Sequence, residues 1–206
     1  MTIARDERAA LVSTLRSVGP DAPTLCEGWT TRDLTAHMIV REYRLDAMPG
    51  ILVPALAGRT RSAQDQAARD DWDAMLAKFA AGPPLYSPLK LVDRFANVTE
   101  MFVHHEDVRR AGGPWEPRDL DPATEKAIRV PLKAMGKRAI AKSPATVEMI
   151  TTDGEKLATG GRGPQVTVTG GPLELLLFAF GRHETLVEYA GDADAVAAVK
   201  SAKRGL

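Results

Sequence analysis

The sequence has little cysteine, few aromatic residues and no excess of charge of either sign. Its 206 residues include one cysteine, Cys26, which excludes an internal disulfide framework and predicts a reducing, cytoplasmic location. Lys and Arg together number 27, as do Asp and Glu, and this balance argues against a nucleic-acid-binding protein. Aromatic residues make up only 5% of the chain, so we expect a monomer or a homodimer without a large interface.

Long apolar runs are also absent. No window reaches the 18 apolar residues of a membrane span, and residues 1–8 lack the apolar core of a signal peptide. Hydrophobic residues make up 44% and charged residues 26% of the chain, which is typical of a soluble globular protein. We therefore expect no membrane partner.

The first two thirds of the chain have the spacing of amphipathic helices. A capping-box pair, Thr30 and Asp33, begins the second helix, and Asp121 followed by Pro122 begins the fifth, in which Pro131 predicts a kink. Residues 51–58 predict a short irregular piece. The predicted helices cover residues 3–18, 29–48, 61–80, 88–111 and 121–140.

The pattern changes after Ser143-Pro144. Residues 145–154 and 155–163 predict two strands joined at the Asp153-Gly154 turn, and residues 164–171 predict a third. Helices are expected over residues 172–182 and 191–202. The sequence therefore predicts a helical domain over 1–142 and a small α+β domain over 145–206.

The fourth predicted helix contains the stretch "TEMFVHHEDVRRAGG" at residues 99–113. Each residue of a helix advances by about 100°, so a set of polar side chains falls on one side with apolar residues on both shoulders. This polar stripe consists of Asp93, Asn97, Glu100, His104 and Asp107. Because polar groups with apolar borders are typical of a bundle interior, we expect the stripe to face inward.

Glu100 and His104 lie four residues apart, the spacing at which one helix offers two ligands to a metal. The same spacing is found in ordinary Glu–His hydrogen bonds, and the local pattern leaves both interpretations open. His105 lies at roughly 140° from Glu100, so we expect it to face outward or to lie at an interface.

A second histidine lies in a similar setting on the second helix. His37 shares its side of the helix with Asp33, Arg41 and Arg44, and apolar residues border them. A single histidine of this kind is commonly a hydrogen-bonded core residue. Two such helices in one bundle also fit a metal site, since bundles build such sites from facing helices.

Three stretches together resemble the DinB-like, mycothiol-dependent maleylpyruvate isomerase superfamily. "PTLCEGWTTRDLTAHMIVRE" at 23–42 resembles its opening motif, in which the matching residues are Cys26, Gly28, Trp29, Asp33, Leu34 and His37. "TEMFVHHEDVRRA" at 99–111 resembles the second motif through Glu100, His104 and Asp107. The stretch "VTVTGGPLELLLFAFGRHETLVEYAGDADAV" resembles the small, sterol-carrier-like C-terminal domain. Within the superfamily, the chain most resembles actinobacterial members described as metal-binding proteins.

The resemblance implies a mainly α fold, with a DinB-type four-helix bundle followed by a small α+β domain. It implies that His37, Glu100 and His104 bind a divalent metal, usually zinc. Two histidines and a carboxylate leave a coordination position open, as in catalytic zinc sites. Family enzymes use the metal to activate the thiol of mycothiol, or of a related small thiol, for attack on a small electrophile.

Four further residues are candidates for supporting roles. Asp107 is expected either to accept a hydrogen bond from His104 or to pair with Arg110 or Arg41. Arg41 is expected either to bind a substrate carboxylate or to pair with a nearby acid. Arg182 matches the arginine that the family's C-terminal domain contributes near the site. Cys26 is interpreted as a small packing residue rather than as a redox thiol.

Three hypotheses follow. The first is a metal- and thiol-dependent transferase or isomerase with Arg182, Arg41 and Asp107 as catalytic residues. The second is a non-catalytic metal-binding or small-ligand carrier protein. The third is a helical protein in which the histidines are purely structural.

Overall fold

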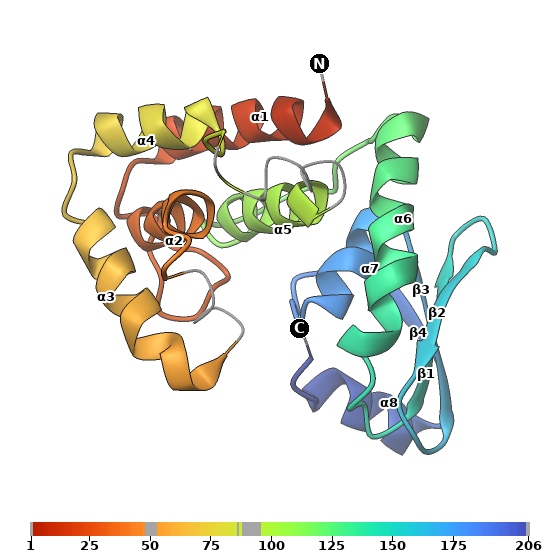
Figure 1. Ribbon diagram of the computed structural model, residues 1–206. Helices are drawn as coiled ribbons and strands as arrows, with labels where there is room; N and C mark the ends of the chain where they lie inside the picture. The colour runs from red at the N-terminus through yellow and green to blue at the C-terminus, as the bar shows by residue number, and fades with distance from the viewer. Residues whose placement is uncertain (1, 48–52, 86, 88–95, 205–206) are drawn as a thin grey trace. The chain divides into compact units, whose positions relative to one another are not determined.

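The computed structural model describes all residues except 1, 48–52, 86, 88–95 and 205–206 (Figure 1). The chain divides into two compact units, Met1–Trp115 and Glu116–Leu206. The first is helical and the second joins helices to one sheet, so the predicted fold class is confirmed. Among the described residues, no helix has the length and apolar character needed to cross a membrane.

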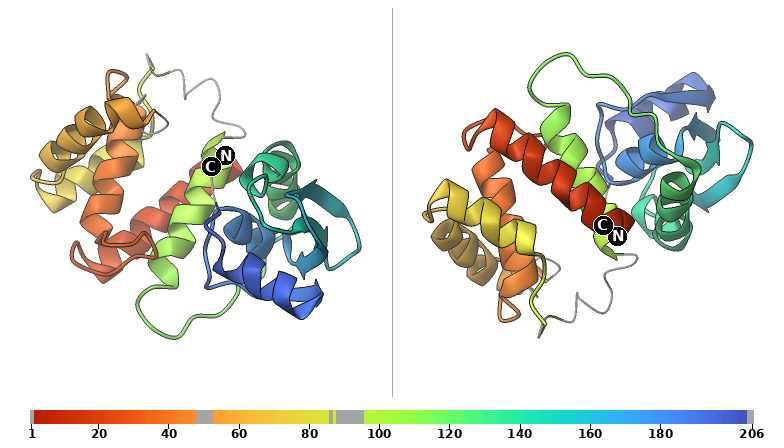
Figure 2. Two further views of the ribbon diagram at one scale, coloured as in Figure 1. Left: turned by 90° about the horizontal axis from the view of Figure 1, so that it is seen from below. Right: turned by 90° about the horizontal axis from the view of Figure 1, so that it is seen from above.

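The first unit is a bundle of helices. Its elements are α1 Ile3–Val18, α2 Thr31–Tyr43, the 3-10 turn η2 Pro54–Leu56, α3 Ala57–Ala67, α4 Trp72–Ala81 and α5 Ala96–Arg109. Helix α1 packs against α4 and α5, and α2 packs against α3 and α4 (Figure 2). The fully buried side chains of Leu11, Leu34, Met75, Phe79 and Met101 join these helices in one apolar cluster.

Helix α2 ends earlier than the sequence predicts. It stops at Tyr43, and residues 45–47 form a turn. The Arg44 guanidinium donates two hydrogen bonds to the Asp46 carboxylate, with Nε–Oδ1 at 2.9 Å and Nη2–Oδ2 at 3.0 Å. The predicted end of the helix at Met48 lies outside the described residues.

The single helix predicted over 61–80 is wrong, because the structure has two. Helix α3 ends at Ala67 and α4 begins at Trp72. Asp71 stands at the N-cap of α4, where its carboxylate accepts a hydrogen bond from the Ala74 amide at 3.0 Å. The apolar residues that suggested one long helix belong to α4, where Met75 and Phe79 face the core.

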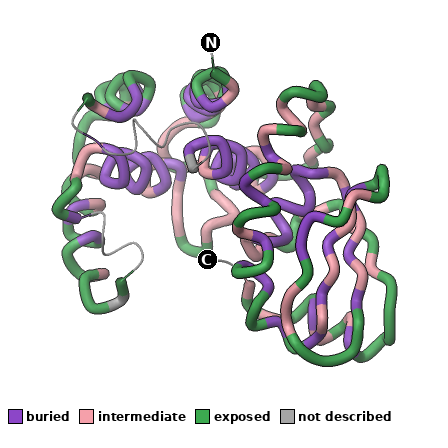
Figure 3. The backbone as a smooth tube through the Cα atoms, turned by 45° about the vertical axis from the view of Figure 1, so that its right-hand side comes forward, coloured by how far each residue is buried: buried purple, intermediate pink, exposed green. Residues whose placement is uncertain are grey.

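Helix α5 is buried around nearly its whole circumference, as the purple turns of Figure 3 show. It begins at Ala96, and the first part of the helix predicted over 88–111 lies outside the described residues. The described members of the polar stripe include Asn97 and Asp107, both fully buried. The prediction that this stripe faces the interior is therefore confirmed for those residues.

The second unit packs helices against a four-stranded sheet. Its elements are α6 Pro122–Ala139, β1 Thr146–Thr151, β2 Lys156–Gly160, β3 Gln165–Gly170, α7 Pro172–Ala179, β4 Val187–Gly191 and α8 Ala193–Ser201. The strand order is β2-β1-β3-β4, with β1 and β3 parallel and the outer pairs antiparallel. Val147, Met149, Val166 and Val168 alternate into the core on the two central strands.

The crossing from β2 to β3 requires glycine. Gly161 has a φ of +87°, and a Cβ at this position would lie 2.1 Å from the Ala145 carbonyl oxygen. Strand β4 is absent from the sequence prediction, because its five residues alternate only weakly between apolar and polar. It pairs with β3 through the register Val168 to Tyr189.

Helix α6 belongs to the second unit, since it packs against β2 and α7. At Gly136 the helix approaches the sheet so closely that a Cβ would lie 2.9 Å from the Cβ of Ala158. The compact units therefore divide before α6, whereas the sequence places the boundary near residue 143. The boundaries 1–142 and 145–206 stay predictions for independently folding domains.

Candidate metal centre

Two central helices of the first unit supply the candidate ligands. Helix α2 begins at a capping box, in which the Asp33 carboxylate accepts from the Thr30 amide at 2.9 Å and from its hydroxyl at 2.8 Å. This confirms the predicted start of α2 and sets the rotation at which His37, one turn on, faces the interior. Helix α5 supplies Glu100 and His104 from successive turns.

His37, Glu100 and His104 come together as one cluster. Each offers a nitrogen or oxygen atom, and these atoms lie within 4.8 Å of one another. His104 Nε2 is 3.3 Å from Glu100 Oε2, and the two imidazole rings meet edge to face with centroids 5.6 Å apart. Two imidazoles and a carboxylate at this spacing suit a divalent cation such as zinc, so the residues fit the metal that the resemblance implies.

His104 is oriented from its other ring nitrogen. Its Nδ1 lies 2.9 Å from Asp107 Oδ2, so Nε2 points toward Glu100. The Cys26 thiol donates to the same carboxylate oxygen at 3.2 Å. Of the two roles considered for Asp107, the structure shows the hydrogen bond with His104. Hydrogen bonds of this kind orient the rings of metal-binding histidines in general.

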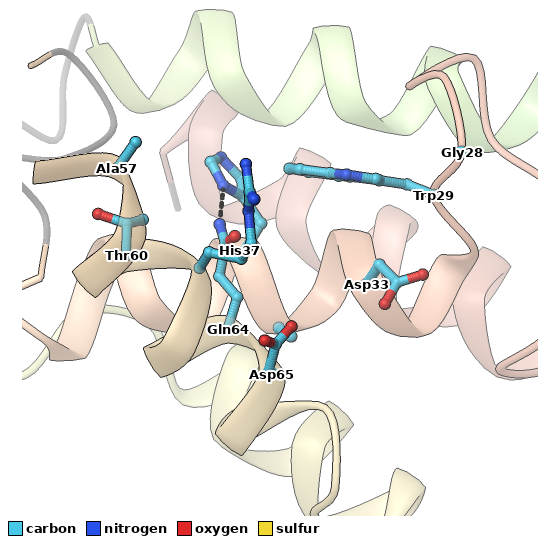
Figure 4. Close-up of a pocket in the computed structure, with 10 residues that line it drawn as sticks. Gly28, Trp29, Asp33, His37, Ala57, Thr60, Gln64 and Asp65 are labelled. Carbon is cyan, nitrogen blue, oxygen red and sulfur yellow. Dashed lines mark hydrogen bonds between the residues drawn. The ribbon is translucent and has the colours of Figure 1, made fainter. Parts of the chain in front are cut away.

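His37 is contacted from α3, where the side-chain nitrogen Nε2 of Gln64 faces its ring. Its Nδ1 lies 2.8 Å from the side-chain amide of Gln64, and the indole of Trp29 lies beside its ring at a centroid distance of 5.1 Å (Figure 4). Gln64 is a functional candidate that the sequence does not single out, because nothing in the pattern of α3 distinguishes it from the other polar residues of that helix.

Arg41 lies one turn beyond His37 on α2. Its Nη1 donates to Asn97 Oδ1 at 2.9 Å, and its Nε is 3.7 Å from Glu100 Oε2. The guanidinium therefore pairs with Glu100, which is one of the two roles predicted for Arg41. Its proposed contact with a substrate carboxylate stays a prediction.

The cluster changes the proton affinity of its members. Burial lowers the pKa of His37 to about 3, and the neighbouring His104 adds to this effect. Burial alone would raise the pKa of Glu100, but its hydrogen bond with His104 and the charge of Arg41 lower it to about 2. Burial alone would lower the pKa of His104, but its hydrogen bonds with Asp107, Cys26 and Glu100 raise that pKa well above the ordinary value. At neutral pH these pKa shifts leave Glu100 ionised, His37 neutral and His104 protonated.

Two other residues, His105 and Arg44, lie elsewhere than the sequence predicts. Of the two positions expected for His105, the outward-facing one is wrong: its side chain is buried, with Nδ1 2.6 Å from Glu7 Oε1 and Nε2 2.9 Å from Thr14 Oγ1, both on α1. The reason is that α1 covers this side of α5. Arg44 lies beyond the end of α2 and pairs with Asp46.

Arg182 follows α7 in the second unit. Its Nη1 donates to the Phe180 carbonyl at 2.8 Å, and its backbone amide donates to the Leu177 carbonyl. These contacts close the end of α7. A role for Arg182 in the reaction stays a prediction.

The fold and the cluster together define a helical-bundle protein with a candidate two-histidine, one-carboxylate metal centre. Residues 1–109 match the model of the mycothiol maleylpyruvate isomerase N-terminal domain family. The match covers more than half of the chain, and the chain belongs to this family. A comparison with curated protein sequences gives no match.

Two solved structures resemble the whole chain. They are crystal structures of a mycothiol-dependent maleylpyruvate isomerase and of its histidine-to-alanine mutant. Each is 13% identical to this chain, with a TM-score of 0.63 over 91% of this chain and 90% of the other. At this identity the likeness establishes the fold.

Proposed function

We propose that this protein is a metal- and thiol-dependent isomerase or transferase. The thiol is mycothiol or a similar small thiol, and the electrophile is a small unsaturated acid such as maleylpyruvate. The observation that carries the proposal is the cluster of His37, Glu100 and His104 inside a bundle of this family. A divalent metal held there, zinc in the first place, supplies Lewis acidity that lowers the pKa of a bound thiol.

The chain's own residues then have separate tasks. His37, Glu100 and His104 would bind the metal, and Asp107 holds the His104 ring through Nδ1, which leaves Nε2 available as a ligand. Arg41 is the proposed partner of the substrate carboxylate, and Arg182 is a further proposed catalytic residue. The thiol sulfur adds to one carbon of the double bond and a proton adds to the other. In an isomerase, rotation about the resulting single bond and loss of both groups regenerate the thiol.

The first test combines metal analysis with turnover. We expect about one divalent metal per purified chain, turnover of maleylpyruvate that requires mycothiol, and loss of that turnover in chelator. Glu100→Ala should remove both the metal and the turnover, because it deletes the only carboxylate of the described cluster. The exposed strand residue Glu188 provides the control, and Glu188→Ala should change neither.

Each alternative outcome has a definite meaning. Turnover that persists in the metal-free Glu100→Ala variant contradicts the proposed mechanism. Stoichiometric metal without any thiol-dependent turnover supports the carrier hypothesis instead. Absence of metal from protein refolded or purified with added zinc supports purely structural histidines.

A further inference from the structure

A cavity of about 450 Å³ lies between α2 and α3, and the ring of His37 forms part of its wall (Figure 4). Gln64 enters this cavity from α3 and meets His37 Nδ1 at 2.8 Å. The contact uses Nδ1, which leaves Nε2 as the other nitrogen of the His37 ring. Gln64 thus contacts a candidate ligand without itself belonging to the cluster of ligand atoms.

A metal at His37 requires one particular tautomer of the ring. With Nδ1 directed at Gln64, Nε2 is the nitrogen left to bind a metal, and its lone pair is available only if Nδ1 carries the proton. Nδ1–H then requires an acceptor. In the structure Gln64 Nε2 faces Nδ1, and a half-turn of the amide group places the acceptor Oε1 there instead.

Helix α3 is held in place at this point. The Thr60 hydroxyl, one turn before Gln64, donates to the Ala47 carbonyl, and Ala63 packs against Val40 of α2 in a small buried cluster. Both anchors join α3 to the segment that carries His37. Gln64 is therefore presented by a fixed element, as an orienting partner must be.

We propose that Gln64 is a positioning residue for the metal centre: it accepts a hydrogen bond from His37 Nδ1–H and so directs Nε2 at the metal. It would do for His37 what Asp107 does for His104 from within α5. This inference rests on the metal site of the proposed function.

The test compares metal affinities of three variants. Gln64→Leu removes the acceptor at similar volume, and Gln64→Glu keeps an acceptor but cannot donate. Gln66→Leu makes the same change at an exposed glutamine of the same helix. We expect zinc affinity, measured by competition with a chromophoric chelator, to fall 10- to 100-fold in Gln64→Leu, to hold or rise in Gln64→Glu, and to stay unchanged in Gln66→Leu.

A second readout separates positioning from stability. Cobalt(II) in place of zinc should show an altered visible spectrum in Gln64→Leu and a nearly wild-type spectrum in Gln64→Glu. The melting temperature of each metal-free variant shows whether it folds. If Gln64→Leu fails to fold, Gln64→Glu still tests the proposal. If Gln64 instead donates to His37 Nδ1, zinc affinity should fall in Gln64→Glu, because a carboxylate cannot donate.

The outcomes distinguish the two proposals. Wild-type affinity in folded Gln64→Leu, or weakened affinity in Gln64→Glu, overturns the role of Gln64 and leaves the metal centre intact. A wild-type protein that binds neither zinc nor cobalt(II) overturns the metal centre, and the role of Gln64 with it.

Discussion

The adjacent residues His104 and His105 point toward different helices. His104 meets Glu100 and Asp107 on its own helix and lies beside His37 of α2. His105 meets Glu7 and Thr14 of α1. Two neighbouring imidazoles thus have separate partners, one set suited to a metal and the other to holding two helices together.

This division predicts different losses in two alanine variants. His104→Ala should lose the metal, because it deletes a ligand. His105→Ala should keep the metal and lose about 1–3 kcal/mol of unfolding free energy, since it leaves the buried Glu7 carboxylate without this hydrogen bond. Elemental analysis and urea denaturation measure the two effects. A folded His105→Ala protein that no longer binds metal would contradict the assignment.

At single residues, the sequence predicts what helical geometry alone determines. The 100° step between neighbours is enough to separate His104 from His105. It does not reveal that α1 covers the side of α5 that carries His105, because that depends on packing between distant segments. Gln64 is unpredictable for the same reason, since its contact with His37 joins residues 27 positions apart.

At the scale of elements, local hydrogen bonds determine which boundaries can be predicted. The starts of α2 and α6 follow from capping residues, Thr30 with Asp33 and Asp121, and both are confirmed. The break between α3 and α4 depends on one cap, Asp71, within a continuous polar and alanine-rich stretch. Strand β4 forms because it pairs with the edge of β3. The pattern of its own five residues does not predict a strand.

The cap of α2 gives a prediction with a control inside the chain. Thr30→Ala should lower the unfolding free energy by about 1 kcal/mol, because it removes one half of a complete capping box. Thr2 also occupies an N-cap, that of α1, but its side chain makes no cap hydrogen bond. Thr2→Ala should therefore cost clearly less in the same urea titration. Equal losses would show that the Thr30 cap does not stabilise α2.

At the scale of the molecule, all residues of the candidate metal centre lie within one unit. The three candidate ligands and their partners Asp107 and Gln64 all lie within Met1–Trp115. Arg182 lies in Glu116–Leu206. We therefore expect metal binding to need only the first unit and the reaction to need both. A fragment that contains the first unit alone can separate the two.

A fragment of residues 1–115 should fold as a helical protein and bind zinc with an affinity close to that of the whole chain. It contains the three candidate ligands and both orienting side chains, so we expect the free energy of metal binding to be retained. The same fragment should lack thiol-dependent turnover, because Arg182, a proposed catalytic residue, is absent. Circular dichroism, zinc competition and a mycothiol assay measure the three properties, with the His104→Ala fragment as the metal-free control. A folded fragment without metal affinity would place part of the centre in residues 116–206, and an unfolded one would show that the bundle needs the second unit to fold.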